Sequence, residues 1–217
     1  MDLFECPAPA YLESIPIGAC PVRWDQVQKL ILRRIDGRTD LTKANIILSA
    51  TITPLLTATD DTKIVVSPFM SNVVIPQGEI LKEGGNDNTT LNGIPQLRGL
   101  GFVNVTAQIR NANSDTVDVM RALTPESALQ PGQTNLEVIL VNKDGKLIVR
   151  EQAGSGSRVE GFPIYNFTVS DVGSAGFAQD NINNIGWDFA PGWSEGHRLL
   201  TPTDYAALTL SNGVSTS

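Results

Sequence analysis

The sequence predicts a β-rich α+β fold: an antiparallel two-sheet sandwich or barrel with one main flanking helix and long loops. Short runs of β-branched and aromatic residues recur along the 217 residues, and tight turns between them favour antiparallel pairing. The 19 glycines and 13 prolines are spread through the chain, as is typical of a turn-rich protein. Strands do not alternate with helices, so a parallel sheet is not expected.

The chain divides into three parts. Residues 1–21 carry prolines at 7, 9, 16 and 21 and are expected to form an extended N-terminal arm. Residues 22–210 form a single sandwich or barrel domain, within which residues 76–100 are an assembly loop. Residues 211–217 are polar and are expected to be a flexible tail.

The strands are predicted from runs with high β propensity. The run at 27–35 also fits a helical stripe, and we favour a strand. The clearest pattern is a hairpin in which Asp144-Gly145 joins two β-rich runs, because glycine accepts the positive φ of a tight turn. Further strands are expected at 46–48, 62–69, 73–75, 101–110, 162–172 and 184–191.

One helix is predicted, over about 114–123. Asn113 or Ser114 can cap its N-terminus, and Asp115 suits the positive end of the helix dipole. The segment SATITPLLTATDD could hold one helical turn, with Thr53-Pro54 at its start.

The stretch EGGNDNTTLNGIPQLRG, residues 83–99, is rich in glycine and asparagine and offers little to a core. Long irregular loops are uncommon in compact domains and are usually binding loops, lids or linkers. We therefore expect a segment without regular structure that is ordered by a partner.

The net charge of −7 argues against a protein that grips a nucleic-acid backbone. The cluster of Lys29, Arg33, Arg34 and Arg38 is interpreted as a solvated face rather than a phosphate patch. No secretory signal or membrane-spanning run is apparent. A protein made in the cytoplasm is expected, and whether Cys6 and Cys20 pair stays open.

Catalytic and metal motifs are weak. Residues 192–196 match G-x-S-x-G, but His197 follows Ser194 by three positions, whereas a nucleophile elbow needs a strand, a turn and a helix with the histidine much later. One histidine and two cysteines do not define a zinc site. We predict no enzyme activity, no metal and no cofactor, and we interpret Trp24, Trp187 and Trp193 as core or interface anchors.

Five segments together resemble the major tail tube proteins of tailed bacteriophages, and the resemblance spans about residues 15–208. They are CPVRWDQVQKL (20–30), ATDDTKIVVSPF (58–69), GGNDNTTLNGIPQLRG (84–99), GFPIYNFTVSD (161–171) and FAPGW (189–193).

The resemblance implies two packed β-sheets with a flanking helix and a virion structural protein that assembles into hexameric rings. The rings stack into a tail tube through which DNA passes on ejection without specific binding. The implied partners are further copies of the chain and other tail and neck proteins, with no membrane, and the implied location is the virion tail, after synthesis in the host bacterial cytoplasm. An acidic lumen would keep DNA from adhering.

The residues expected at the assembly interface lie in the loop and at two tryptophans. They are Glu83, Asn86, Asp87, Asn88, Thr89, Leu91, Ile94, Pro95, Trp24 and Trp193. Deleting residues 84–93 is expected to leave a folded monomer that does not assemble. The alternatives are a head–tail connector or terminator, a capsid decoration protein and, less favoured, a secreted β-sandwich binding module.

Overall fold

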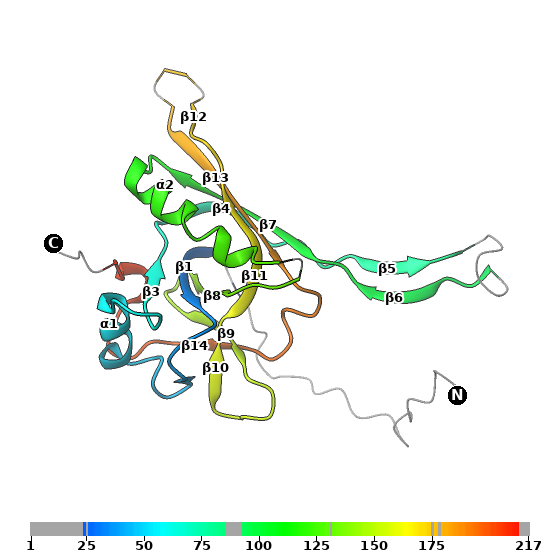
Figure 1. Ribbon diagram of the computed structural model, residues 1–217, viewed down its shortest axis with the longest axis horizontal. Helices are drawn as coiled ribbons and strands as arrows, with labels where there is room; N and C mark the ends of the chain where they lie inside the picture. Colours follow the sequence, from blue (N-terminus) through cyan, green and yellow to red (C-terminus); the bar gives the residue numbers. More distant parts are fainter. Residues whose placement is uncertain are drawn as a thin grey trace.

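The computed structural model describes residues 24, 26–85, 93–130, 132–174, 176–177 and 179–212. In this part of the chain a twelve-stranded sheet curls around a hydrophobic core, and a separate two-stranded ribbon extends away from the body (Figure 1). Two α-helices flank the curled sheet. The β-rich, antiparallel character predicted from the sequence is confirmed. The predicted arm at 1–21 lies outside the described residues.

The elements follow the chain in a strand-rich order in which helices are rare. They are β1 (Val27–Arg34), β2 (Leu41–Thr42), α1 (Ser49–Thr57), β3 (Ile64–Val66), β4 (Met70–Val74), β5 (Ile80–Glu83), β6 (Gln96–Leu100), β7 (Val103–Arg110), α2 (Ser114–Arg121), the short 3₁₀ turn Pro125–Ser127, β8 (Leu136–Asn142), β9 (Leu147–Glu151), β10 (Arg158–Glu160), β11 (Phe162–Val169), β12 (Gly173–Ser174), β13 (Asn181–Phe189), β14 (His197–Leu200) and the 3₁₀ turn Ala207–Thr209.

Strands β1 and β8 lie at the centre and serve two cores at once. All seven residues of β8 are buried, and β8 pairs with β1 over most of its length. Because successive side chains of a strand point to opposite faces, Leu30 and Leu32 enter one core while Ile31 between them enters the other. The first core lies against β7, β11 and β13, and the second lies against α1 and the C-terminal segment.

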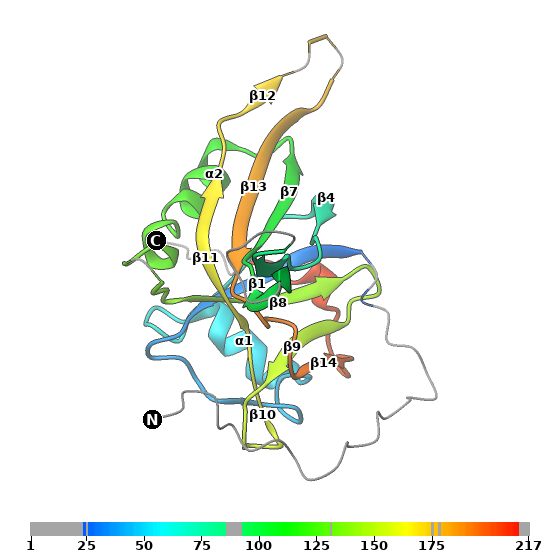
Figure 2. The same ribbon diagram turned by 90° about the vertical axis from the view of Figure 1, so that its right-hand side faces the viewer.

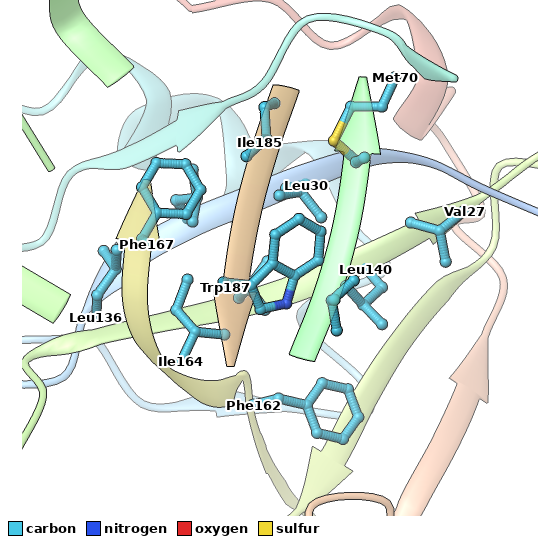
Figure 3. Packing of buried hydrophobic residues seen from close by; sticks show 14 of the residues in the cluster. Val27, Leu30, Met70, Leu136, Leu140, Phe162, Ile164, Phe167, Ile185 and Trp187 are labelled. Carbon is cyan, nitrogen blue, oxygen red and sulfur yellow. The ribbon is translucent and has the colours of Figure 1, made fainter. Parts of the chain in front are cut away.

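The first core is built around Trp187 of β13, which is fully buried (Figure 3). Leu140 of β8, Ile164 of β11 and Leu30 of β1 surround its ring. These residues come from strands far apart in the sequence, so burial of this one side chain ties the two parts of the curled sheet together.

Strand β11 joins the part of the sheet that contains β8 to the part that contains β13. Its first residues, Phe162 and Pro163, pair with β8, whereas residues from Ile164 onward pair with β13. Just before β11, the backbone at Gly161 lies close to that of β8. A Cβ added at Gly161 would lie 3.0 Å from the backbone N, C and O atoms of Val138. Glycine at this position therefore lets the two chain segments approach.

Replacing Gly161 by alanine is expected to lower the free energy of unfolding by about 1–3 kcal/mol, the usual effect of overpacking a well-packed site. The added methyl group meets backbone atoms, which cannot rotate away. Urea denaturation measures the change. Gly173→Ala is the matched control, because its Cβ would make an ordinary 3.5 Å contact with the carbonyl oxygen of Ile182. Equal stabilities of the two variants would contradict the packing argument.

Most predicted elements are present. The hairpin turn at 142–145 joins β8 to β9, and Gly145 has a φ of 73°. Helix α2 begins where predicted, with the Asn113 side chain accepting a hydrogen bond from the Thr116 amide at 2.8 Å. No described helix has the length and apolar character needed to cross a bilayer.

Three expectations were wrong. Residues 46–48 form turns rather than a strand, with Ile46 buried in the second core. The segment around Pro54 forms the nine-residue helix α1 rather than a single turn. The two ends of the loop at 76–100, expected to lack regular structure, instead pair as β5 and β6.

Candidate assembly surfaces

The ribbon of β5 and β6 projects from the body of the molecule (Figure 1), and in the turned view it points towards the reader (Figure 2). Its strand residues are exposed, apart from the half-exposed Gly99. Apolar side chains are prominent among them, with Ile80 57% exposed and Leu97 70% exposed. A two-stranded hairpin is at best marginally stable in water unless a further strand or a packed face supports it. The ribbon is thus an apolar element for which this chain supplies no cover among the described residues.

Three of the predicted interface residues lie on this ribbon. Glu83 of β5 forms an ion pair with Arg98 of β6, and Pro95 lies across from Gly85, closing the two sides of the ribbon towards its tip. Ile94 is 62% exposed. Asn86, Asp87, Asn88, Thr89 and Leu91 lie outside the described residues.

The structure brings Trp24 and Trp193 together at the base of the ribbon, away from the other predicted interface residues. Their ring centroids lie 5.1 Å apart with the planes at 81°, and Trp193 stacks on Phe189 at 4.1 Å. Both tryptophans are partly buried against the first core. Together they border a cavity of about 520 Å³ that reaches the base of the ribbon, lined by Trp24, Gln26, Val27, Val73, Ile75, Pro76, Gln77, Gly78, Trp193 and Ser194.

A second surface is the outer face of β4, β7, β13 and β11, which stand side by side in the sheet. The alternation along β7 buries Val103 and Val105 and exposes Asn104 and Thr106, so one face of the strand is apolar and the other polar. The same alternation continues in β13, and the polar face is hollowed by a shallow depression of about 660 Å³.

Amide side chains on this polar face bond to one another across the strands. The Asn72 amide donates to Gln108 at 2.7 Å, and Gln108 donates in turn to Asn184 at 3.3 Å. Further along, Asn104 and Asn166 each donate to one carboxylate oxygen of Asp188 at 2.8 Å. The result is a hydrogen-bonded lattice of mostly uncharged groups, which the sequence analysis missed because its members lie on four separate strands.

The two outer strands of this face both contain a β-bulge. The register shifts between Ser71 and Val74 in β4 and between Tyr165 and Thr168 in β11. Bulges bend a strand and increase its twist, and sheets use them to curl. This explains why the four strands form a curved rather than a flat surface.

The two edges of the four-strand surface differ. Side chains seal the β11 edge: the Ser127 hydroxyl accepts from the Phe167 amide at 2.8 Å, and the Thr134 hydroxyl donates to the Ile164 carbonyl at 2.6 Å. Strand β4 ends the sheet on the opposite side. An open edge strand is a template for pairing with another chain, whereas a covered edge is not.

At one end of the polar face, the pKa of Asp180 is held below its ordinary value. The Asn111 amide donates to its carboxylate at 2.8 Å, and the Arg110 guanidinium donates at 3.0 Å. Because the pKa is lower in the folded state, these bonds stabilise the fold above the ordinary aspartate pKa of about 3.9. That stabilisation is lost as the pH falls through the lowered value.

Replacing Asn111 by glycine is expected to raise the pKa of Asp180 towards its ordinary value, because the first of these donors is removed. Glycine keeps the φ of 50° at this position accessible. A ¹³C NMR titration of the Asp180 carboxylate measures the change. Gln108→Ala, which alters the same face without touching Asp180, should leave the pKa where it is; an unshifted pKa in Asn111→Gly would contradict the assignment.

The G-x-S-x-G segment lies in the turn that joins β13 to β14, and a strand rather than a helix follows it. His197 places its Nδ1 atom 2.8 Å from the carbonyl oxygen of Ser194. No cluster of described histidine, cysteine, aspartate or glutamate side chains could hold a metal ion.

Comparison with known proteins gives no assignment. No family model matches the chain, and neither the curated proteins nor the solved structures contain a match.

Proposed function

We propose that this chain is a virion structural protein, the repeating subunit of a bacteriophage tail tube. In this proposal identical copies associate head to tail into rings, the rings stack, and DNA passes through the channel. The observation that carries the proposal is the exposed apolar ribbon of β5 and β6, which needs cover that the described part of the chain does not supply. Another copy of the chain supplies that cover.

The unlike edges of the four-strand surface support a contact between different faces of two copies. With β11 sealed and β4 at the end of the sheet, the chain offers two dissimilar sides. Contacts between dissimilar faces form a closed ring when the rotation from one copy to the next divides a full turn evenly. Otherwise they form an open filament. The finer fold that goes with this proposal is a two-sheet sandwich whose curved sheet contributes a segment of the channel wall.

The polar face of β4, β7, β13 and β11 is the channel wall in this proposal. Binding to DNA phosphates needs clustered lysine and arginine. The cation on these strands is Arg110, and Asp180 pairs with it at 3.0 Å. The wall therefore avoids adhesion through hydrogen-bonded amides and the carboxylate of Asp188, which make this face weakly acidic. Other tail and neck proteins of the virion are the further partners.

Changing the ribbon tests the proposal. Replacing Ile94 and Leu97 together by aspartate is expected to weaken self-association by about a hundredfold or more, because a buried unpaired charge costs several kcal/mol. Both side chains are exposed in the monomer, so the fold should be retained. Sedimentation velocity measures association, and urea denaturation measures stability.

Leu129→Asp is the matched control for the ribbon variant. Leu129 is 53% exposed and belongs to the connection between α2 and β8, not to the ribbon. It should associate like the unaltered chain. Unchanged association of the ribbon variant would refute the role assigned to β5 and β6.

A further inference from the structure

A cavity of about 790 Å³ lies between strand β3, helix α2 and the C-terminal segment at 210–212. This volume falls within the range of roughly 300–1,000 Å³ that is typical of ligand sites. Half of the lining residues are apolar, among them Val65, Val119 and Met120, and none of the described lining residues is aromatic. Val119 of α2 is 55% exposed, so part of this apolar wall is uncovered.

Several polar groups along the β3 side of the cavity are already paired. The Asn212 side chain accepts a hydrogen bond from the Val66 amide at 2.6 Å and donates one to the Val66 carbonyl at 2.9 Å. The Ser67 hydroxyl accepts from the Leu30 amide at 2.8 Å and donates to the Pro68 carbonyl at 2.9 Å. A peptide that adds a strand needs a free backbone edge. With Val66 occupied, the three residues of β3 offer little such edge, and the cavity suits a small molecule better.

The lining group that still seeks a partner is the ammonium of Lys29. Lys29 of β1 is only 7% exposed. Its Nζ atom donates to the Leu210 carbonyl at 2.9 Å and lies 4.4 Å from the centre of the Phe69 ring. An ammonium group has three donors, and within the described part of the chain one hydrogen bond uses them.

Lys29 also lacks a counter-charge among the described residues. Burial lowers its pKa, and no described carboxylate counteracts this shift. A buried charge that is not paired is costly. An anionic occupant of the cavity would offset this cost and take up the remaining donors.

The charges of the lining favour a single negative charge on the occupant. Lys29 and the exposed Lys63 carry two positive charges, and Asp115 is the one carboxylate among the described lining residues. The cavity therefore has an excess of one positive charge beside an apolar wall.

We propose that this cavity binds a small carboxylate with an aliphatic chain, its carboxylate at Lys29 and its chain against Val65, Val119 and Met120. The aliphatic chain follows from the apolar wall and from the lack of an aromatic ring among the described lining residues. This site goes beyond the proposed self-assembly and does not depend on it.

Isothermal titration calorimetry of the full-length chain with octanoate tests the proposal. We expect saturable binding of one octanoate per chain. Acetate has the charge without the chain and octan-1-ol the chain without the charge, so each should bind at least about tenfold more weakly. Absence of saturable octanoate binding would overturn the proposal. Tighter binding of benzoate than of octanoate would overturn the assignment of an aliphatic chain.

Two variants locate the bound octanoate. Lys29→Met removes the charge and keeps an unbranched side chain, so octanoate should bind at least about tenfold more weakly while octan-1-ol binds as before. Val119→Trp fills the cavity from an exposed position of α2 and should abolish the binding of both. Lys82→Met is the matched control, since Lys82 is exposed on β5 and does not line the cavity.

Urea denaturation establishes that each variant is folded. Octanoate binding by folded Lys29→Met that equals binding by the unaltered chain would overturn the proposal. If Lys29→Met does not fold, Val119→Trp decides, and undiminished binding by this variant would be equally contrary. A chain that binds octanoate but never forms tubes would contradict the proposed tube and support this site, whereas tubes without octanoate binding would do the reverse.

Discussion

Replacing Glu137 by glutamine is expected to lower the free energy of unfolding by about 3–5 kcal/mol, the usual effect of removing one partner of a buried ion pair. Glu137 of β8 is completely buried and binds both Arg33, which is equally enclosed, and Arg38. Burial lowers the pKa of Arg33, and Glu137 counteracts this shift. Without the carboxylate, the Arg33 guanidinium is left enclosed without its counter-charge.

The size of this effect depends on burial, so an exposed pair is the control. Asp171 bonds to Arg121 at 2.6 Å, but its side chain is 97% exposed. Asp171→Asn should leave the urea midpoint within error of the unaltered chain, because solvent screens such pairs. A loss for Glu137→Gln no greater than that of the control would show that the pair does not carry the stability assigned to it.

A paired replacement separates the charge from the packing. Changing Arg33 to methionine and Glu137 to leucine together should recover most of the loss, since apolar residues often replace a buried ion pair without cost. Arg38 retains a partner in this variant, because it also bonds to Glu160 at 2.8 Å. A double variant as unstable as Glu137→Gln would contradict this account.

Replacing Phe162 by alanine is expected to lower the free energy of unfolding by about 3–5 kcal/mol. Phe162 is fully buried at the first residue of β11, where this strand leaves β8. Its ring lies 5.2 Å from Trp193 and 6.0 Å from Phe189. Truncation therefore opens a cavity beneath the aromatic cluster and removes its edge-to-face contacts.

The control for Phe162 is another aromatic residue that is poorly buried. Phe102 is 58% exposed, and its ring centroid lies 5.9 Å from that of Tyr165. Phe102→Ala should change the stability by less than about 1 kcal/mol, as surface substitutions do. Urea denaturation compares the two variants, and similar losses would contradict the central place given to Phe162. Near-ultraviolet circular dichroism should also lose signal in Phe162→Ala, since the ordered rings produce it.

Local patterns were sufficient for the elements whose signals lie within a few residues. The hairpin at 142–145 has its turn residues between its own strands, and α2 has its cap at Asn113. Helix α1 differs because Asp204 caps it, accepting hydrogen bonds from the Ser49 amide at 2.6 Å and hydroxyl at 2.9 Å. A cap supplied by a residue so distant in sequence has no local signature.

The charged residues show a similar limit. The cluster that includes Arg33 was interpreted as a solvated face, yet Arg33 is 4% exposed. Its partner, Glu137, lies directly opposite it on the neighbouring strand β8. Only the pairing of β1 with β8 reveals that Arg33 belongs to a buried ionic cluster with Glu137 and Arg38.

The proposed assembly surfaces were predictable in part. The composition of residues 83–99 predicted a segment that offers little to a core, and the residues of β5 and β6 are exposed apart from the half-exposed Gly99. That a partner covers them stays a prediction. The pairing of the two strands was missed because exposed ribbon residues show no alternation of buried and polar positions. The amide lattice was missed because Asn104, Asn166 and Asp188 belong to three different strands.

The central claim is that this chain completes its exposed ribbon by association with copies of itself. Electron microscopy of the purified protein at increasing concentration tests it most directly, with sedimentation velocity on the same samples. The account predicts rings of uniform diameter that stack into tubes. Rings that never stack would instead indicate a connector, and a monodisperse monomer at every concentration would contradict the account.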